Sequence, residues 1–217
     1  MARRTTKKRR LTIMVSSTVY GIEDLLDQVY AVLTRFGYEV WMSHRGTVTV
    51  NSNDHPFESS LKAVDECDLF LGLITPQYGS GVAKGEISIT HQEFIRAIEK
   101  NKPRWFLAHE YVVFARLLLR GLGYRTQEQR DAITDFKRAG TLDDLRVVGM
   151  YEAATRDGVK FADRTGSWVQ KFSSLDDAML FTTAQFHRYQ EIETFLHNNL
   201  QDPTVVKSAV EARSRGK

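Results

Sequence analysis

The sequence predicts an α/β protein with a doubly wound, mostly parallel sheet and a helical C-terminal extension. From Leu11 to Ala108, short apolar runs alternate with longer segments of helical periodicity. The run Leu69–Ile74 has no polar residue and no alternation, as expected for a strand that is buried on both faces of a parallel sheet. The 217 residues are enough for one sizeable hydrophobic core.

The first predicted unit is a strand, a turn and a helix. Leu11–Val15 is a short apolar run with β-branched residues, and small polar residues and Gly21 follow it. Apolar side chains then recur every three or four residues, which predicts a helix with one face on the sheet, and Gly37 ends it. The apolar positions are Ile22, Leu25, Leu26, Val29, Leu33 and Phe36.

Further strands and helices complete the predicted sheet in the order that is typical of a doubly wound fold. The strands are Tyr38–Met42, Leu69–Ile74 and Arg104–Ala108, and the helices between them are Phe57–Asp65 and Ile89–Lys100.

The second half of the chain is predicted to be mainly helical. We expect helices at Tyr111–Gly121, from Thr126 with a Thr-x-x-Gln capping box, and from Ser174 toward Asn199, with a strand at Val147–Tyr151. One domain is expected over residues 11–200, between a flexible basic tail at 1–10 and a flexible tail at 201–217.

The formal net charge of +3 comes from the first ten residues. These hold six basic side chains, and the remainder has 24 basic against 27 acidic ones. The tail is interpreted as a solvated arm, a phosphate-contacting arm or a short targeting segment, so nucleic acid is a possible partner only through it.

Cysteine content and hydropathy point to a cytoplasmic protein. The single cysteine, Cys67, forms no intramolecular disulfide, which fits a reducing compartment. No apolar stretch approaches the roughly 20 residues that span a bilayer, so no membrane partner is expected.

The motifs of the commonest dinucleotide-redox enzymes, nucleotide triphosphatases, zinc proteases and esterases are missing from the sequence. The six histidines have no metal-ligand spacing. We therefore expect no metal site and no resident cofactor.

Ligands of doubly wound sheets bind beyond the carboxyl ends of the strands. Ser16 and Ser17 follow the first strand, where their hydroxyls can donate to a ribose or phosphate, and the following helix N-terminus favours anions. Tyr78 can stack on a base or on nicotinamide, and Gly79 permits close backbone approach. Asp68, at the opposite end of its strand, is expected to be structural.

Glu93 is the candidate catalytic residue, and two interpretations of it stay open. On a helix it shares a face with Thr90, Phe94 and Ala97, which turns the carboxyl toward the sheet and its pocket, where Ser88 also lies. Alternatively, Thr90-x-x-Glu93 forms a capping box. His91, off this face, is expected to be exposed.

Several short motifs follow one another over roughly residues 11–110. They are Val15–Tyr20, Gly37–Val40, Cys67–Gly72 with Tyr78-Gly79, and Ser88–Phe94 with Lys102-Pro103. This ordered set resembles a TIR-like family of uncharacterised bacterial domains, which often stand N-terminal to signalling ATPases linked to defence. The resemblance implies a flavodoxin-like or TIR-like fold and a homo-oligomer or a partner chain.

The helix with Glu93 is also similar to the corresponding helix of TIR-domain NAD-cleaving enzymes and nucleoside deoxyribosyltransferases. In those enzymes a glutamate in this place attacks or stabilises the anomeric carbon of a ribosyl group. The resemblance implies a domain that binds a nucleotide-type molecule such as NAD and cleaves an N-glycosidic bond, with Glu93 as the catalytic carboxylate. The alternative is a non-catalytic module for nucleotide sensing or self-association.

Overall fold

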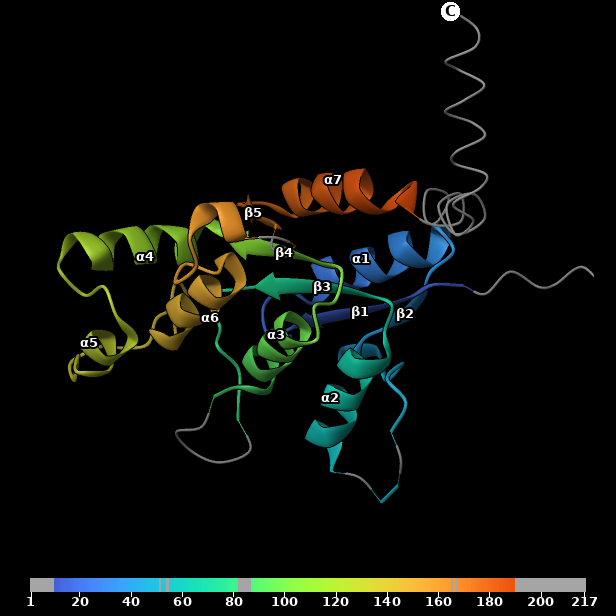
Figure 1. The fold of residues 1–217 in the computed structure, drawn as a ribbon, viewed down its shortest axis with the longest axis horizontal. Coiled ribbons are helices and arrows are strands. Elements are labelled where there is room, and N and C mark those ends of the chain that lie inside the picture. Colours follow the sequence, from blue (N-terminus) through green and yellow to red (C-terminus); the bar gives the residue numbers. More distant parts are fainter. Residues whose placement is uncertain are drawn as a thin grey trace, which may run out of the picture.

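The computed structural model describes residues 10–50, 52–53, 55–81, 87–164, 166 and 168–189. Five strands form one sheet in the order β2-β1-β3-β4-β5, and each neighbouring pair is parallel (Figure 1). This confirms the predicted fold class. The strands are β1 Thr12–Ser17, β2 Glu39–Trp41, β3 Leu69–Ile74, β4 Arg104–His109 and β5 Trp168–Phe172.

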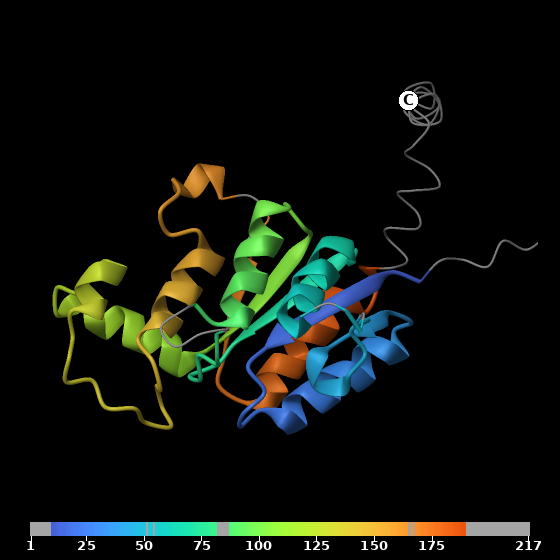
Figure 2. The ribbon, with the colours of Figure 1, turned by 90° about the horizontal axis from the view of Figure 1, so that it is seen from below.

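Helices cover both faces of the sheet. Figure 2 shows α1 and α7 on one side and α2 and α3 on the other, and two separate apolar clusters fill the spaces beneath them. Beside α3, α6 packs against the same face, while α4 and α5 extend beyond it. The bounds are α1 Glu23–Arg35, α2 Pro56–Glu66, α3 Ile89–Glu99, α4 Glu110–Gly121, α5 Gln127–Asp131, α6 Arg146–Thr155 and α7 Leu175–Phe186, with short 3-10 turns at Ser43–Arg45 and Phe161–Asp163.

Strand β3 is the centre of the sheet, and every one of its residues is buried. Gly72 lies under two aromatic rings, since a Cβ there would come within 2.6 Å of Phe106 and 2.7 Å of Phe94. The two ring centroids are 5.0 Å apart. The missing side chain therefore lets α3 pack close to the sheet. This close packing brings Glu93 of α3 within reach of β1.

Asp68 joins β1 to β3 at the amino ends of the strands. Its carboxylate accepts hydrogen bonds from the Thr12 amide at 2.8 Å and from the Thr12 hydroxyl at 3.0 Å. Asp68 therefore has a structural role at the edge opposite the candidate site.

The predicted strand Val147–Tyr151 is wrong, because these residues lie in helix α6. Its buried side chains are Val147, Val148, Met150 and Ala154, which share a helical face and do not alternate. The fifth strand is β5 instead. It is an edge strand with mainly exposed side chains, so its sequence carries little hydrophobic alternation.

Several expectations concern residues outside the described part of the chain. The basic tail, apart from Arg10, residues 190–200 of the predicted last helix and the tail at 201–217 all fall there. Within the described residues, the predicted uninterrupted helix from Ser174 toward Asn199 is wrong, because α7 ends at Phe186 with His187 as its C-cap. The capping box from Thr126 to Gln129 is confirmed at the start of α5. Among the described helices, none has the length and apolar character needed to cross a membrane.

Gly72→Ala is expected to lower the free energy of unfolding by about 1–3 kcal/mol, because the added methyl group overpacks the core between Phe94 and Phe106. Urea denaturation measures this change. Gly140→Ala is the control, since a Cβ there meets nothing within 4 Å. Equal stability of the two variants would contradict the packing described for β3.

Candidate functional site

A cavity of about 360 Å³ opens at the carboxyl edge of the sheet. It lies between the end of β1, the turn after β2, the loop after β3 and the first two turns of α3, where ligands of doubly wound sheets bind. Its polar lining is made of Ser17, Thr18, Tyr20, Ser43, His44, Ser80, Thr90 and Glu93, with Gly79 on one wall.

Glu93 lies in the wall of this cavity, and the residue as a whole is only 3% exposed. The Ser16 hydroxyl, also buried, donates a hydrogen bond to Glu93 Oε2. Burial raises the pKa of Glu93 from its usual 4.5 to about 7, and hydrogen bonds from Ser16 and Ser60 oppose this rise. Both protonation states of Glu93 are therefore populated near neutral pH.

The capping interpretation of Glu93 is wrong. The N-cap of α3 is Ser88, whose hydroxyl accepts a hydrogen bond from the His91 amide at 3.3 Å. Thr90 lies inside the helix and lines the cavity. The Glu93 side chain reaches across to Ser16 in β1. Ser88 itself is completely buried and does not contribute to the cavity wall.

Hydrogen bonds hold together the two loops that form the mouth of the cavity. Thr18 Oγ1 is 2.8 Å from both Thr75 Oγ1 and the Gln77 carbonyl oxygen. Gly79 has φ 80°, and a Cβ there would come within 2.4 Å of Thr18 Cγ2. Only glycine allows this approach without strain. Ser17 also lines the cavity and donates to the Thr18 carbonyl at 2.8 Å.

Tyr78 faces a second hollow, away from Glu93. Its buried ring lies under the Arg146 guanidinium, 4.5 Å from its centroid, and its hydroxyl is 2.9 Å from His91 Nδ1. The stacking role predicted for Tyr78 is therefore not available in the cavity of Glu93. His91 is partly buried and not exposed as expected, and burial together with Arg146 lowers its pKa to about 4.

Two side chains at the rim were missed by the sequence reasoning. Tyr20 is 75% exposed and lines the cavity, and so does His44, from the turn after β2. Both follow a strand at its carboxyl end, and that position is the signal that points to them. The anion site expected at the first helix is not supported, because Glu23 and Asp24 occupy the first turn of α1.

The charge of the lining limits what the cavity can hold. Among its described lining residues there is no lysine or arginine, and Glu93 is the single carboxylate. Within the described part of the chain, no group of three or more histidine, cysteine, aspartate or glutamate side chains is arranged to hold a metal ion.

The fold and this edge cavity define an α/β domain of the doubly wound class. The chain belongs to the family described as Domain of unknown function (DUF4062), whose model matches residues 12–164. Its structure is similar to the TIR domains of the activated Roq1 resistosome that directly recognises the pathogen effector XopQ, with a TM-score of 0.48 and 9% sequence identity over 80% of this chain and 98% of that one. No curated protein matches the chain.

The raised pKa of Glu93 makes stability depend on pH. As the pH rises above 4.5, the unfolded chain loses the Glu93 proton before the folded protein does, so the free energy of unfolding falls until about pH 7. Glu93→Gln has no proton to lose. We expect its stability to gain about 2.5 kcal/mol relative to the wild type between about pH 5 and pH 8.

Urea denaturation of both proteins at the two pH values measures this gain. Glu99→Gln, on the exposed side of the same helix, is the matched control and is expected to follow the wild type. A gain of the same size in Glu99→Gln, or none in Glu93→Gln, would refute the account of Glu93.

Proposed function

We propose that this protein binds NAD or a nucleoside derivative and cleaves its N-glycosidic bond. The observation that carries the proposal is the buried Glu93 carboxyl in the cavity wall, held by Ser16. A carboxylate at the anomeric carbon either stabilises the oxocarbenium-like charge that develops during cleavage or forms a covalent intermediate. The raised pKa and the burial of Glu93 fit a carboxylate that works in a dry site.

The presence of one carboxylate among the described lining residues favours NAD over ordinary nucleosides. Glycosidases generally use two carboxyl groups, and one of these protonates the leaving group. The described lining offers only Glu93. Nicotinamide leaves NAD as a neutral molecule, because its ring nitrogen takes the electrons of the broken C1′–N bond and loses its positive charge. Water then supplies the oxygen bound to C1′ and releases a proton, so no second acid is needed.

The remaining lining fits the nicotinamide riboside half of the substrate. The Ser17 and Thr90 hydroxyls can bond ribose hydroxyls, and Tyr20 at the rim can stack on a flat ring. A volume of about 360 Å³ is at the small end of ligand pockets. The cationic ring also suits the described lining residues, which include Glu93 and no lysine or arginine.

The setting that we propose is signalling or antiviral defence in the cytoplasm. It rests on the sequence motifs shared with TIR-like bacterial domains, on the availability of NAD in the cytoplasm, and on the single, buried Cys67. In this setting the domain acts as a homo-oligomer or with a partner chain.

A non-catalytic nucleotide-sensing module is the second candidate. The same deep burial of Glu93 favours it, because a residue that is only 3% exposed offers little surface to a substrate. Such a module would be stabilised by NAD in a thermal-shift assay, since a ligand that binds only the folded state raises its apparent stability. It would yield no product.

Nicotinamide release from NAD, followed by chromatography with mass detection, tests the proposed activity. We expect release by the wild type and a loss of at least about 100-fold in Glu93→Gln, because the variant lacks the charge that stabilises the transition state. Glu99→Gln is expected to keep the wild-type rate. Binding of NAD without release of nicotinamide, at concentrations where the protein is assembled, would contradict the proposed cleavage and would support the sensing module.

Tyr20→Ala is expected to raise the KM for NAD by about tenfold with kcat almost unchanged, because a stacking contact binds ground state and transition state alike. Tyr20→Phe keeps the ring and is expected to keep the wild-type KM. A fall in kcat with an unchanged KM in Tyr20→Ala would contradict the stacking role.

A further inference from the structure

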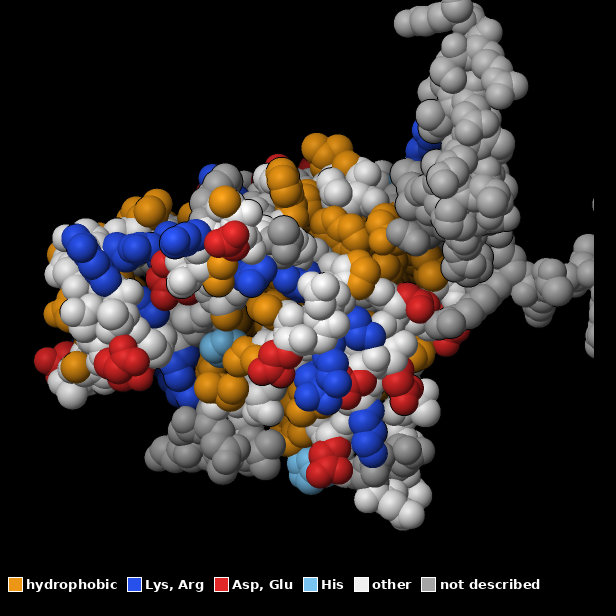
Figure 3. Space-filling view, viewed as in Figure 1, with side chains coloured by type: hydrophobic (Ala, Val, Ile, Leu, Met, Phe, Trp, Pro, Cys, Tyr) orange, Lys and Arg blue, Asp and Glu red, His pale blue; other side chains and the backbone are white. Residues whose placement is uncertain are grey.

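Helix α4 exposes its apolar side chains. Tyr111, Phe114, Leu117 and Leu118 recur at helical spacing, Leu122 continues the row, and all five are between 44% and 65% exposed. In Figure 3 hydrophobic side chains protrude at the upper left outline of the molecule, in the region of α4. A helix at the surface of a monomer ordinarily turns such a face toward the core.

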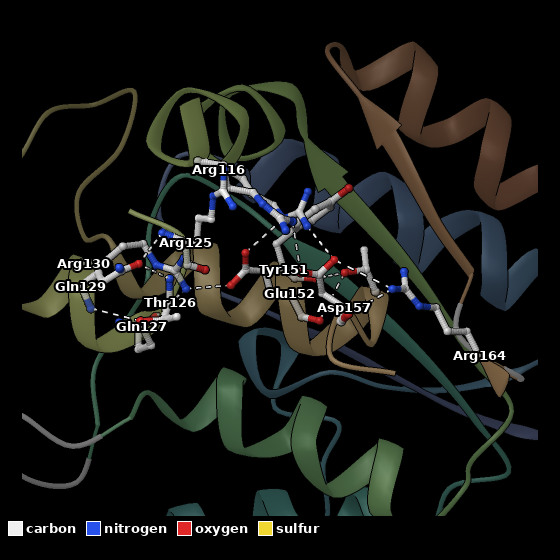
Figure 4. Close-up of polar contacts among 12 residues, drawn as sticks. Arg116, Arg125, Thr126, Gln127, Gln129, Arg130, Tyr151, Glu152, Asp157 and Arg164 are labelled. Atoms are coloured by element: carbon white, nitrogen blue, oxygen red, sulfur yellow. Dashed lines mark hydrogen bonds and ion pairs between the residues drawn. The ribbon is translucent and has the colours of Figure 1, made fainter. Parts of the chain in front are cut away.

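Helix α4 packs a separate apolar face inward, and the arginines beside that face are paired with residues in and just after α6. Arg116 is 15% exposed, and its guanidinium contacts Glu152 Oε1 at 3.1 Å and Asp157 Oδ1 at 2.7 Å (Figure 4). Arg120 contacts the other oxygen of Asp157 at 3.1 Å. Glu152 also accepts from the buried Arg130 at 2.7 Å. These ion pairs and the buried apolar face together hold α4 on α6, so the exposed apolar row stays at the surface.

The exposed face is large enough for a weak specific interface. Its five side chains expose on the order of 500 Å² together, taking roughly 200 Å² for each large apolar side chain. A patch of this size is typical of an interaction surface. Two such faces would bury about 1,000 Å² in total, which is at the low end for specific complexes.

We propose that the α4 face is a homodimer interface on which a second copy of this chain packs antiparallel across a two-fold axis. The apolar row is nearly symmetric about its midpoint, between positions 116 and 117. In an antiparallel pair, Tyr111 of one copy lies opposite Leu122 of the other, and Phe114 lies opposite Leu118. Such self-matching is what an isologous interface requires.

The charges at the ends of α4 complement one another in the same arrangement. Glu110 begins the helix, and Arg125 follows its C-terminal end. Antiparallel pairing brings Glu110 of one copy toward Arg125 of the other, twice in each dimer, and it also opposes the two helix dipoles favourably. The inference does not depend on the proposed cleavage activity.

Analytical ultracentrifugation of the full chain over a range of concentrations tests the proposal. We expect the wild type to shift reversibly from monomer to dimer at micromolar concentrations. Leu117→Glu is expected to weaken association at least about tenfold, because it puts two like charges beside the axis. Leu180→Glu is the matched control. Leu180 is an exposed leucine of α7, 72% exposed, and its variant is expected to dimerise like the wild type.

Mild oxidation of Leu117→Cys gives a test that does not rely on disruption. The cysteines of two copies meet near the axis, so a disulfide-linked dimer is expected as the main product, whereas Leu180→Cys is expected to stay monomeric. The native Cys67 is buried. A wild type that stays monomeric throughout, or a Leu180→Glu variant as impaired as Leu117→Glu, would overturn the proposal.

Discussion

A buried carboxyl group needs hydrogen-bond donors, and one donor to Glu93, beside Ser60, is the hydroxyl of Ser16. This one bond links helix α3 to the carboxyl end of β1 across the floor of the cavity. Two further residues determine the position of α3. Gly72 lets the aromatic rings of α3 and β4 settle onto the central strand, and Ser88 starts the helix early enough that Glu93 faces inward. Each of these residues contributes to holding the carboxyl in a poorly solvated position.

The same arrangement separates two hollows on either side of the Tyr78-Gly79 loop. Gly79 closes on Thr18 and borders the cavity of Glu93, while Tyr78 turns to the other side and packs under Arg146. Beyond Arg146, ion pairs among α4, α5 and α6 fix the outer part of the domain. The domain thus presents a chemical site at the sheet edge and an apolar face on α4, and different interactions maintain the two.

The sequence predicts most of the central sheet because its strands are buried and strongly apolar. It fails where the hydrophobic pattern is weak or ambiguous. The edge strand β5 has few buried side chains, and Val147–Tyr151 consists of residues that suit either a strand or a helix. In both places the packing partner decides the structure, and a single sequence does not reveal that partner.

The candidate site was predicted in part. Its place at the carboxyl edge and the inward face of Glu93 follow from periodicity and strand direction. Whether Glu93 caps the helix or faces the pocket depends on which residue starts the helix. The sequence does not decide this, because Ser88 and Thr90 are both good N-caps. Tyr78 and Tyr20 are both loop tyrosines, but only Tyr20 lines the cavity, whereas Tyr78, next to the left-handed Gly79, packs under Arg146.

An NMR titration of the Glu93 carboxyl carbon tests the central claim most directly. We predict a midpoint near pH 7 in the wild type, and a higher midpoint in Ser16→Ala, because the Ser16 hydrogen bond stabilises the charged form and lowers the pKa. A Glu93 midpoint near the usual 4.5, or no change in Ser16→Ala, would contradict a buried carboxyl held by Ser16.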